Sequence, residues 1–206
     1  MHPCRFAGQV LWSIFAVEQH PVTDTKAVTI RRATQADAVL LSNLLELCVH
    51  DLSDVFSIDI GADGRFGYAN LPLYWTDPET RFAFLIRAGA HTAGFALVTR
   101  GSPVSDNPED LDLAEFFVLR RHRRSGVGKR AAGLLWALIP GRWIVRVSEG
   151  NRPAIPFWES AIRAYTHGEF SEAPRPGGLH GWRVFSFTVR DDVAKSARGG
   201  DSEGTI

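Results

Sequence analysis

The most constraining feature of the sequence is an apolar, strand-like run that leads through an arginine-rich turn into a helix-like segment. The run Leu113–Leu119 is apolar except for Glu115. Five basic residues follow in Arg120–Arg124, and the next apolar periodicity, over Gly126–Ile139, is typical of a helix whose first and third residues are glycine. A buried strand that enters a helix in this way favours a layered domain of mixed α and β structure.

The start of this helix has the properties of an anion-binding site. The first backbone N–H groups of a helix have no partner within it, and the helix dipole adds positive character there. Glycine lets the backbone approach an anion closely, and arginine side chains reinforce the attraction. The segment therefore predicts a site for a diphosphate group.

Three phosphate-binding motifs compete for this segment. A P-loop would need glycine in place of Arg123 and serine or threonine in place of Arg130, so that pattern fails twice. The dinucleotide fingerprint G-x-G-x-x-A is matched by Gly126, Gly128 and Ala131, although it normally follows its strand after a tight turn alone. A nucleotide-binding oxidoreductase therefore stays an alternative.

The third motif, Gln/Arg-x-x-Gly-x-Gly/Ala, is matched position for position by Arg123, Gly126 and Gly128. A second motif follows one predicted strand later, because Asn151–Trp158 is similar to the pattern Asn-x-x-Ala-x-x-Φ-Tyr. Together the two motifs resemble the GCN5-related N-acetyltransferase (GNAT) superfamily over most of residues 28–190. The alternative is an ordinary α/β domain with a basic turn and a capped helix.

The resemblance implies an α/β (α+β) fold with a mixed, mostly antiparallel central sheet flanked by helices. The other sequence patterns agree with the element order β-α-α-β-β-β-α-β-α-β. Strands are expected over 28–31, 81–87, 91–99, 113–119, 143–147 and 182–189, and helices from Thr34 through Cys48, as one short helix within 51–70, over 126–139 and over 151–165.

The resemblance also implies acetyl-CoA as cosubstrate. In the family the pantetheine arm pairs with a freed strand, which here is Phe117–Leu119, and a backbone N–H near Val118 would polarise the thioester carbonyl. Backbone amides at the start of the helix would hold the pyrophosphate, and the second motif would lie beside the cofactor. The implied cofactor-binding residues are Phe117, Val118, Leu119, Arg123, Arg124, Ser125, Gly126, Val127, Gly128, Lys129, Asn151, Phe157 and Trp158.

The implied reaction is direct transfer of an acetyl group to a primary amine of a small molecule or peptide. Glu115 is the ionisable residue inside the apolar strand, and burial raises a carboxyl pKa toward the range of a general base. Trp158 stands where the family often has a tyrosine acid, and an indole cannot take that role. Tyr165 is the candidate substitute, although a thiol leaving group does not always need an acid. A catalytically impaired acyl-CoA-binding sensor is the alternative function.

The acceptor site is expected around the first long helix and the loop after it. Acids and aromatic side chains gather in this region and would suit a cationic amine. The residues are Asp51, Asp54, Asp59, Asp63, Tyr68, Tyr74 and Trp75.

Charge and cysteine content restrict the classes of partner. Lys and Arg number 23 and Asp and Glu number 23, so a globally basic surface for nucleic acid or membranes is excluded. The apolar stretch 7–17 is shorter than the roughly 20 residues that span a bilayer. Cys4 and Cys48 lie too far apart in sequence for a disulfide framework or zinc site. We expect no metal, no nucleic acid or membrane partner, and a cytoplasmic location.

The composition of the two ends predicts the domain boundaries. Residues 1–27 are expected to be an N-terminal extension, 28–190 the GNAT-like acyltransferase domain and 191–206 a disordered C-terminal tail. A homodimer stays an open expectation.

Overall fold

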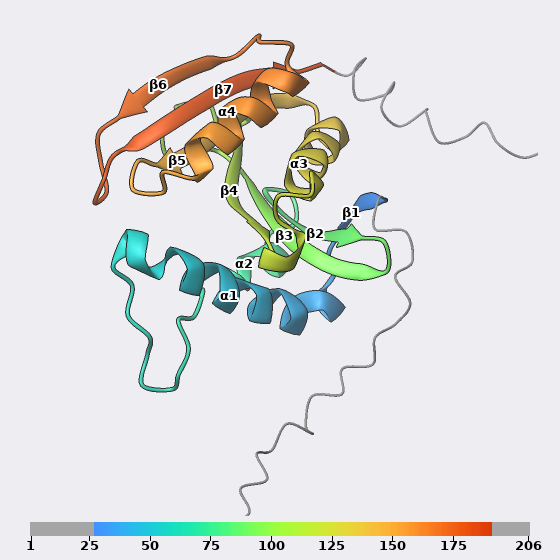
Figure 1. Cartoon of the computed structure of the whole chain (residues 1–206), viewed down its shortest axis with the longest axis vertical. Helices are drawn as coiled ribbons and strands as arrows, with labels where there is room; N and C mark the ends of the chain where they lie inside the picture. The colour runs from blue at the N-terminus through green and yellow to red at the C-terminus, as the bar shows by residue number, and fades with distance from the viewer. Residues whose placement is uncertain (1–26, 191–206) are drawn as a thin grey trace, which may run out of the picture.

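A computed structural model describes residues 27–190 of the chain (Figure 1). The expected disordered tail and all but the last residue of the expected N-terminal extension lie outside the described residues. Two 3₁₀ turns occur at Gln35–Asp37 and Arg120–His122. The helices and strands, in chain order, are β1 (Val28–Arg32), α1 (Ala38–Phe56), α2 (Leu73–Thr76), β2 (Arg81–Ala88), β3 (His91–Arg100), β4 (Leu111–Val118), α3 (Val127–Leu138), β5 (Gly141–Ser148), α4 (Ala154–Tyr165), β6 (Ser171–Arg175) and β7 (Trp182–Val189).

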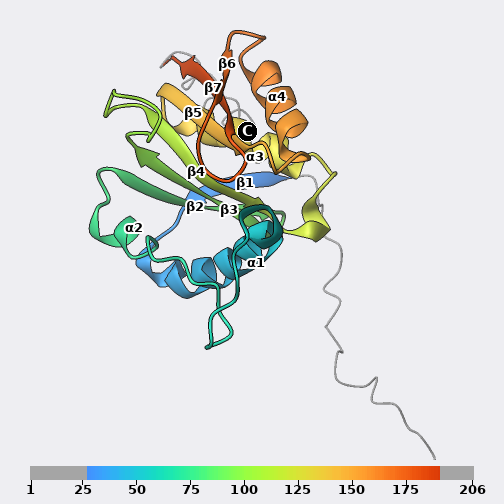
Figure 2. The ribbon, with the colours of Figure 1, turned by 90° about the vertical axis from the view of Figure 1, so that its left-hand side faces the viewer.

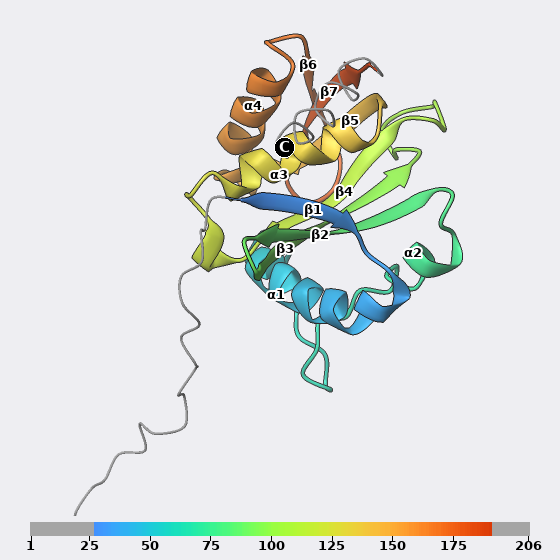
Figure 3. The ribbon, with the colours of Figure 1, turned by 90° about the vertical axis from the view of Figure 1, so that its right-hand side faces the viewer.

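The strands form one seven-stranded sheet in the order β1-β2-β3-β4-β5-β7-β6. All neighbours are antiparallel except β4 and β5, which are parallel. Helices α1 and α2 lie on one face of the sheet and α3 and α4 on the other (Figures 2 and 3). The mixed, mostly antiparallel sheet flanked by helices is thereby confirmed.

Two apolar layers hold the helices to the sheet. On the face covered by α1, side chains such as Leu41, Leu45 and Phe95 are buried together. On the opposite face, α3 and α4 bury Trp136 and Ile162 against β5 and β7. The helix periodicities of the sequence therefore correspond to the faces that contact the sheet.

The first long helix begins as the sequence predicts but continues further. The Asp37 carboxylate accepts a hydrogen bond from the Thr34 backbone N–H (2.9 Å), which fixes the entry to α1. Since α1 extends to Phe56, Asp51 and Asp54 belong to this helix and not to a loop. The prediction of a short helix within 51–70 is also wrong, because the short helix α2 lies at Leu73–Thr76.

Strand β6 was absent from the expected element order. All five of its residues are exposed, and it contains Pro174, so it has no alternating apolar pattern. It lies at the edge of the sheet beside β7, where a proline costs no ladder hydrogen bond on the open side. The sequence signal for a half-buried strand was therefore missing.

Among residues 27–190, no helix has the length and apolar character needed to cross a membrane.

Candidate active site

The site begins where β4 separates from β5. These two strands pair only at Leu111–Trp143 and Asp112–Ile144, although each contains eight residues. The β3–β4 pairing is shifted at the same place, because Leu97 faces Glu115 whereas Val98 faces Leu113. Ala114 is thus the extra residue of a β-bulge, a feature that bends a strand and redirects its side chains. In the part of the chain that the structure describes, the rest of β4 has no β-strand neighbour on its β5 side.

Glu115 lies immediately after the bulge, inside the opening between the strands. The Tyr68 hydroxyl donates a hydrogen bond to Glu115 Oε1 (3.3 Å). Burial raises the pKa of Glu115 to about 7, with Asp112 adding to the increase, whereas Tyr68 and the Arg146 charge oppose it. Burial also raises the pKa of Tyr68, so its hydroxyl stays a donor. A carboxyl group with a pKa near 7 can accept a proton at neutral pH.

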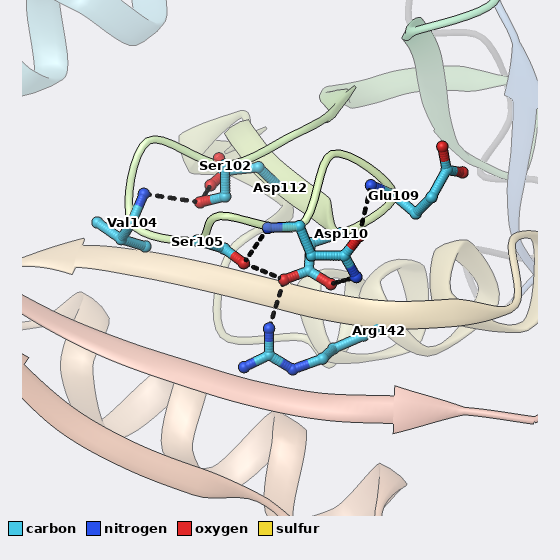
Figure 4. A network of polar contacts seen from close by, with 8 residues as sticks. Ser102, Val104, Ser105, Glu109, Asp110, Asp112 and Arg142 are labelled. Atoms are coloured by element: carbon cyan, nitrogen blue, oxygen red, sulfur yellow. Dashed lines mark hydrogen bonds and ion pairs between the residues drawn. The ribbon is translucent and has the colours of Figure 1, made fainter.

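A buried ion pair joins the two strands at the base of the opening. Arg146 of β5 donates two hydrogen bonds to Asp112 of β4, from Nε (2.8 Å) and Nη2 (2.9 Å). The Asp112 carboxylate is fully buried and also accepts a hydrogen bond from Ser102 (Figure 4). A second contact, from Arg142 to Asp110, ties β5 to the loop before β4. Side chains therefore link β4 to β5 where their backbone pairing ends.

The opening contains a cavity of about 370 Å³. Its walls come from the C-terminal half of α1, the loop containing Tyr68, the separated parts of β4 and β5, the start of α4, and Trp182 of β7. Glu115 and Arg146 are its charged lining residues. The cavity is therefore a mainly apolar chamber with a single carboxylate.

The end of β4 presents a free backbone donor to this opening. The Leu119 N–H donates to the Ala93 carbonyl of β3 (2.8 Å). Because backbone groups alternate sides along a strand, the Val118 N–H points away from β3, toward the opening. The side chain of Phe117 is buried beneath α1. The predicted segment Phe117–Leu119 thus offers one backbone donor, the Val118 N–H, because the Val118 carbonyl accepts from Arg123 Nε (2.6 Å) and the Leu119 carbonyl accepts from the His122 N–H (2.8 Å).

The turn after β4 ends at the start of α3. Gly126 is the N-cap residue with a φ of +83°, and a Cβ there would meet no atom within 4 Å. Arg124 also has a positive φ, of +60°. A Cβ at Gly128, by contrast, would lie 3.2 Å from the Phe157 ring. Gly126 therefore provides an open approach to the first amides of α3, whereas Gly128 lets α3 pack closely on α4.

The side chain of Arg123 is partly exposed and lies against β4 and α1. Its Nε donates to the Val118 carbonyl (2.6 Å), and Arg123 and Arg120 both pair with Asp51 of α1. Asp51 therefore anchors the basic turn and is not available to an acceptor amine. The Ser125 hydroxyl donates to the His122 carbonyl (2.9 Å).

Two further predicted cofactor residues occupy different environments. Val127 is buried beside Val118, so only its backbone can contact a ligand. Lys129 lines a shallow groove between α3 and α4.

Solved acetyltransferase structures share the fold of this domain. An acetyltransferase from Thermus thermophilus matches with a TM-score of 0.59 and 18% identity, over 81% of this chain and 100% of that one. A putative GNAT-family acetyltransferase from Desulfovibrio desulfuricans matches with a TM-score of 0.55 and 16% identity, over 80% and 100%. A spermidine N-acetyltransferase from Vibrio cholerae, in complex with CoA and spermine, matches with a TM-score of 0.55 and 11% identity, over 79% and 95%. The domain has the GNAT fold. No family model and no curated protein matches the sequence.

The second GNAT-like motif is divided between the cavity and the core. Asn151 lines the cavity, and its carbonyl accepts the Ala154 N–H (3.0 Å) at the start of α4. Trp158 also lines the cavity, with its ring 5.0 Å from that of Phe116 and 4.9 Å from that of Phe157. These aromatic rings connect the wall of the cavity to the hydrophobic core between the sheet and helices α3 and α4.

Tyr165, the candidate acid, lies elsewhere. Its ring packs 5.0 Å from that of Trp136, and its buried hydroxyl has no hydrogen-bond partner among residues 27–190. It does not line the cavity that contains Glu115. Tyr165 is the last residue of α4, and its side chain faces α3. The structure does not bring Tyr165 and Glu115 together.

Sequence reasoning missed Arg146 and the role of Tyr68. Arg146 is a single charge inside the apolar strand Trp143–Val147, which is the same signal that singled out Glu115. Tyr68 was placed in the acceptor region, but its contact with Glu115 joins residues 47 positions apart. No local pattern records such a contact.

Within the described range 27–190, no group of three or more His, Cys, Asp or Glu side chains is placed to hold a metal ion.

Proposed function

We propose that the protein is an N-acetyltransferase that transfers the acetyl group of acetyl-CoA directly to a primary amine. The observation that carries this proposal is the position of Glu115. Its carboxyl group, with a pKa of about 7, lies at the point where the backbone of β4 loses its neighbour. The proposed base Glu115, the Val118 N–H and the start of α3 at Gly126 follow one another along a single segment of the chain.

The GNAT fold supports a definite orientation of the cosubstrate. Of the segment Phe117–Leu119, the Val118 N–H would contact the pantetheine arm, and the open amides from Arg124 to Lys129 would hold the pyrophosphate. The space beside the Gly126 backbone suits a pyrophosphate group, because no side chain of the described residues fills it. Acetyl-CoA supplies the thioester whose acetyl group is transferred.

The residues of the cavity can assist each step of the transfer. Glu115 accepts the proton of the acceptor ammonium, directly or through water, which frees the nitrogen lone pair. The Val118 N–H donates to the thioester oxygen while the nitrogen–carbon bond forms. The carbon–sulfur bond then breaks, and the sulfur leaves as a thiolate that takes up, directly or through water, the second proton lost by the nitrogen. Tyr68 positions Glu115 through its hydrogen bond.

A second candidate function is an acyl-CoA-binding sensor that does not catalyse transfer. The specific observation in its favour is that α4 brings no hydroxyl acid to the cavity, since Trp158 lines it and Tyr165 does not. The two functions differ in one measurable property. The sensor binds acetyl-CoA but releases no free thiol with any amine.

The proposal is tested by measuring the melting temperature with and without acetyl-CoA, together with thiol release in the presence of amines. We expect acetyl-CoA to raise the melting temperature of the wild-type protein and Gly126→Ala to abolish this increase. Gly168→Ala is the matched control, because Gly168 also has a positive φ (+92°) and open space but lies after α4. An unchanged melting temperature at saturating acetyl-CoA would overturn the proposal.

A further inference from the structure

The wall of the cavity is apolar on the side of α1. Val49, Leu52 and Phe56 line it from this helix. The Phe56 ring stacks on the Trp182 ring of β7, with centroids 6.0 Å apart and an interplanar angle of 29°. This stack joins α1 to the second half of the sheet. A molecule that enters the cavity beside Glu115 therefore contacts aromatic and aliphatic surface.

The charges of the cavity accommodate a single ammonium group. Of the described residues that line it, Glu115 is the one carboxylate and Arg146 the one cationic side chain. Arg146 is held by Asp112 and lies over the Trp182 ring, 5.5 Å from its centroid. A second ammonium group on the same molecule would meet this guanidinium without a carboxylate to offset its desolvation.

The acids that suggested a cationic acceptor amine lie outside the cavity wall. Asp51 pairs with two arginines of the basic turn. Asp54, Asp59 and Asp63 do not line the cavity, and the Asp63 carboxylate accepts the Arg65 backbone N–H (3.2 Å). The acidic composition of this region therefore does not describe the acceptor site.

We propose that the acceptor is a primary amine with one positive charge and an apolar, aromatic-sized body. This inference rests on the proposed acetyltransferase function. The amine nitrogen lies at Glu115, which takes its proton, and the apolar body contacts Val49, Phe56 and Trp182. The nitrogen gains the acetyl group as the carbon–sulfur bond breaks, and the departing coenzyme A thiolate takes up the second proton that the nitrogen loses.

The test compares 2-phenylethylamine with spermidine as acceptors, with thiol release as the readout. We expect kcat/KM for 2-phenylethylamine to be at least about 100-fold higher, from burial of one phenyl group and exclusion of extra charge. Val49→Glu adds a second carboxylate to the wall, and we expect it to change the ratio by about tenfold in favour of spermidine. Leu47→Glu is the matched control, because Leu47 is 50% exposed on the same helix.

Each outcome supports or overturns the inference. Equal or better use of spermidine by the wild-type protein overturns it, as does an identical response of the two glutamate variants. Preference for octanoyl-CoA over acetyl-CoA, with no discrimination between the amines, would assign the apolar wall to an acyl chain and also overturns it. If acetyl-CoA raises the melting temperature but neither amine reacts, the acceptor class is wrong while cofactor binding stands. Without that increase, the proposed function itself falls.

Discussion

Replacement of Glu115 by glutamine tests the origin of its altered pKa. A rise from the ordinary value of 4.5 to about 7 means that the folded state holds the proton more tightly than the unfolded state. Between these values the folded protein binds more protons, so stability is lost as pH rises toward 7. The full difference is equivalent to about 3 kcal/mol. Glu115→Gln removes this penalty, because glutamine does not ionise.

The measurement is urea unfolding of the wild-type and Glu115→Gln proteins at pH 5 and pH 8. We expect Glu115→Gln to become more stable relative to the wild type by about 2 to 3 kcal/mol between these two pH values. Tyr68 can still donate to the amide oxygen of glutamine, so this hydrogen bond is retained in the variant and does not contribute to the stability difference. An equal stability difference at both pH values would show that burial does not raise the pKa of Glu115.

The same variant separates the catalytic role of Glu115 from its effect on stability. If its carboxylate is the base, kcat/KM of the wild type is about tenfold lower at pH 6 than at pH 8, because the ionised fraction falls by that factor. Glu115→Gln lowers the rate by about 10² to 10⁴ and removes the inflection near pH 7. The ionisation of the acceptor amine affects both proteins equally. A glutamine variant that keeps the inflection would exclude Glu115 as the base.

Three further substitutions probe the surroundings of the site. Tyr68→Phe removes a hydrogen bond that lowers the pKa of Glu115, so the kcat/KM profile is expected to shift to higher pH; a shift to lower pH would contradict the assigned contact. Arg146→Met leaves the buried Asp112 carboxylate without its partner and is expected to cost about 3–5 kcal/mol in urea unfolding, with a smaller loss when Asp112→Leu is added. Gly94→Ala places a Cβ 1.9 Å from the Phe117 carbonyl oxygen, so it is expected to cost more than about 3 kcal/mol by separating β3 from β4; unfolding at the wild-type urea midpoint would show that the strands tolerate the change.

The sequence predicted the helices and strands in which a regular spacing of apolar residues marks the buried face. The strands over 81–87 and 91–99 and the helix over 126–139 agree with β2, β3 and α3 within a few residues. Exposed β6 had no such pattern. The sheet order also depends on long-range pairing, such as β5 with β7, which no local spacing records.

The candidate site was predicted where its signal lies in adjacent residues. Glu115 and Gly126 belong to one segment, so strand, turn and helix could be read together. Tyr165 was assigned by its distance along α4, but the direction of a helical side chain depends on its angle around the axis, and this residue faces Trp136. Asp51 was assigned from composition, whereas its arginine partners lie about 70 residues away in sequence.

The bulge at Ala114 explains why one glutamate in an apolar strand is tolerated. Glu115 follows the bulge directly, lines the cavity and accepts the Tyr68 hydrogen bond. The Asp112–Arg146 pair holds the strands together immediately before the bulge. The strands can therefore separate beyond this point without loss of register. The bulge and the strand separation thus lie together with Glu115, the Val118 N–H and the apolar wall where we propose that the acceptor binds.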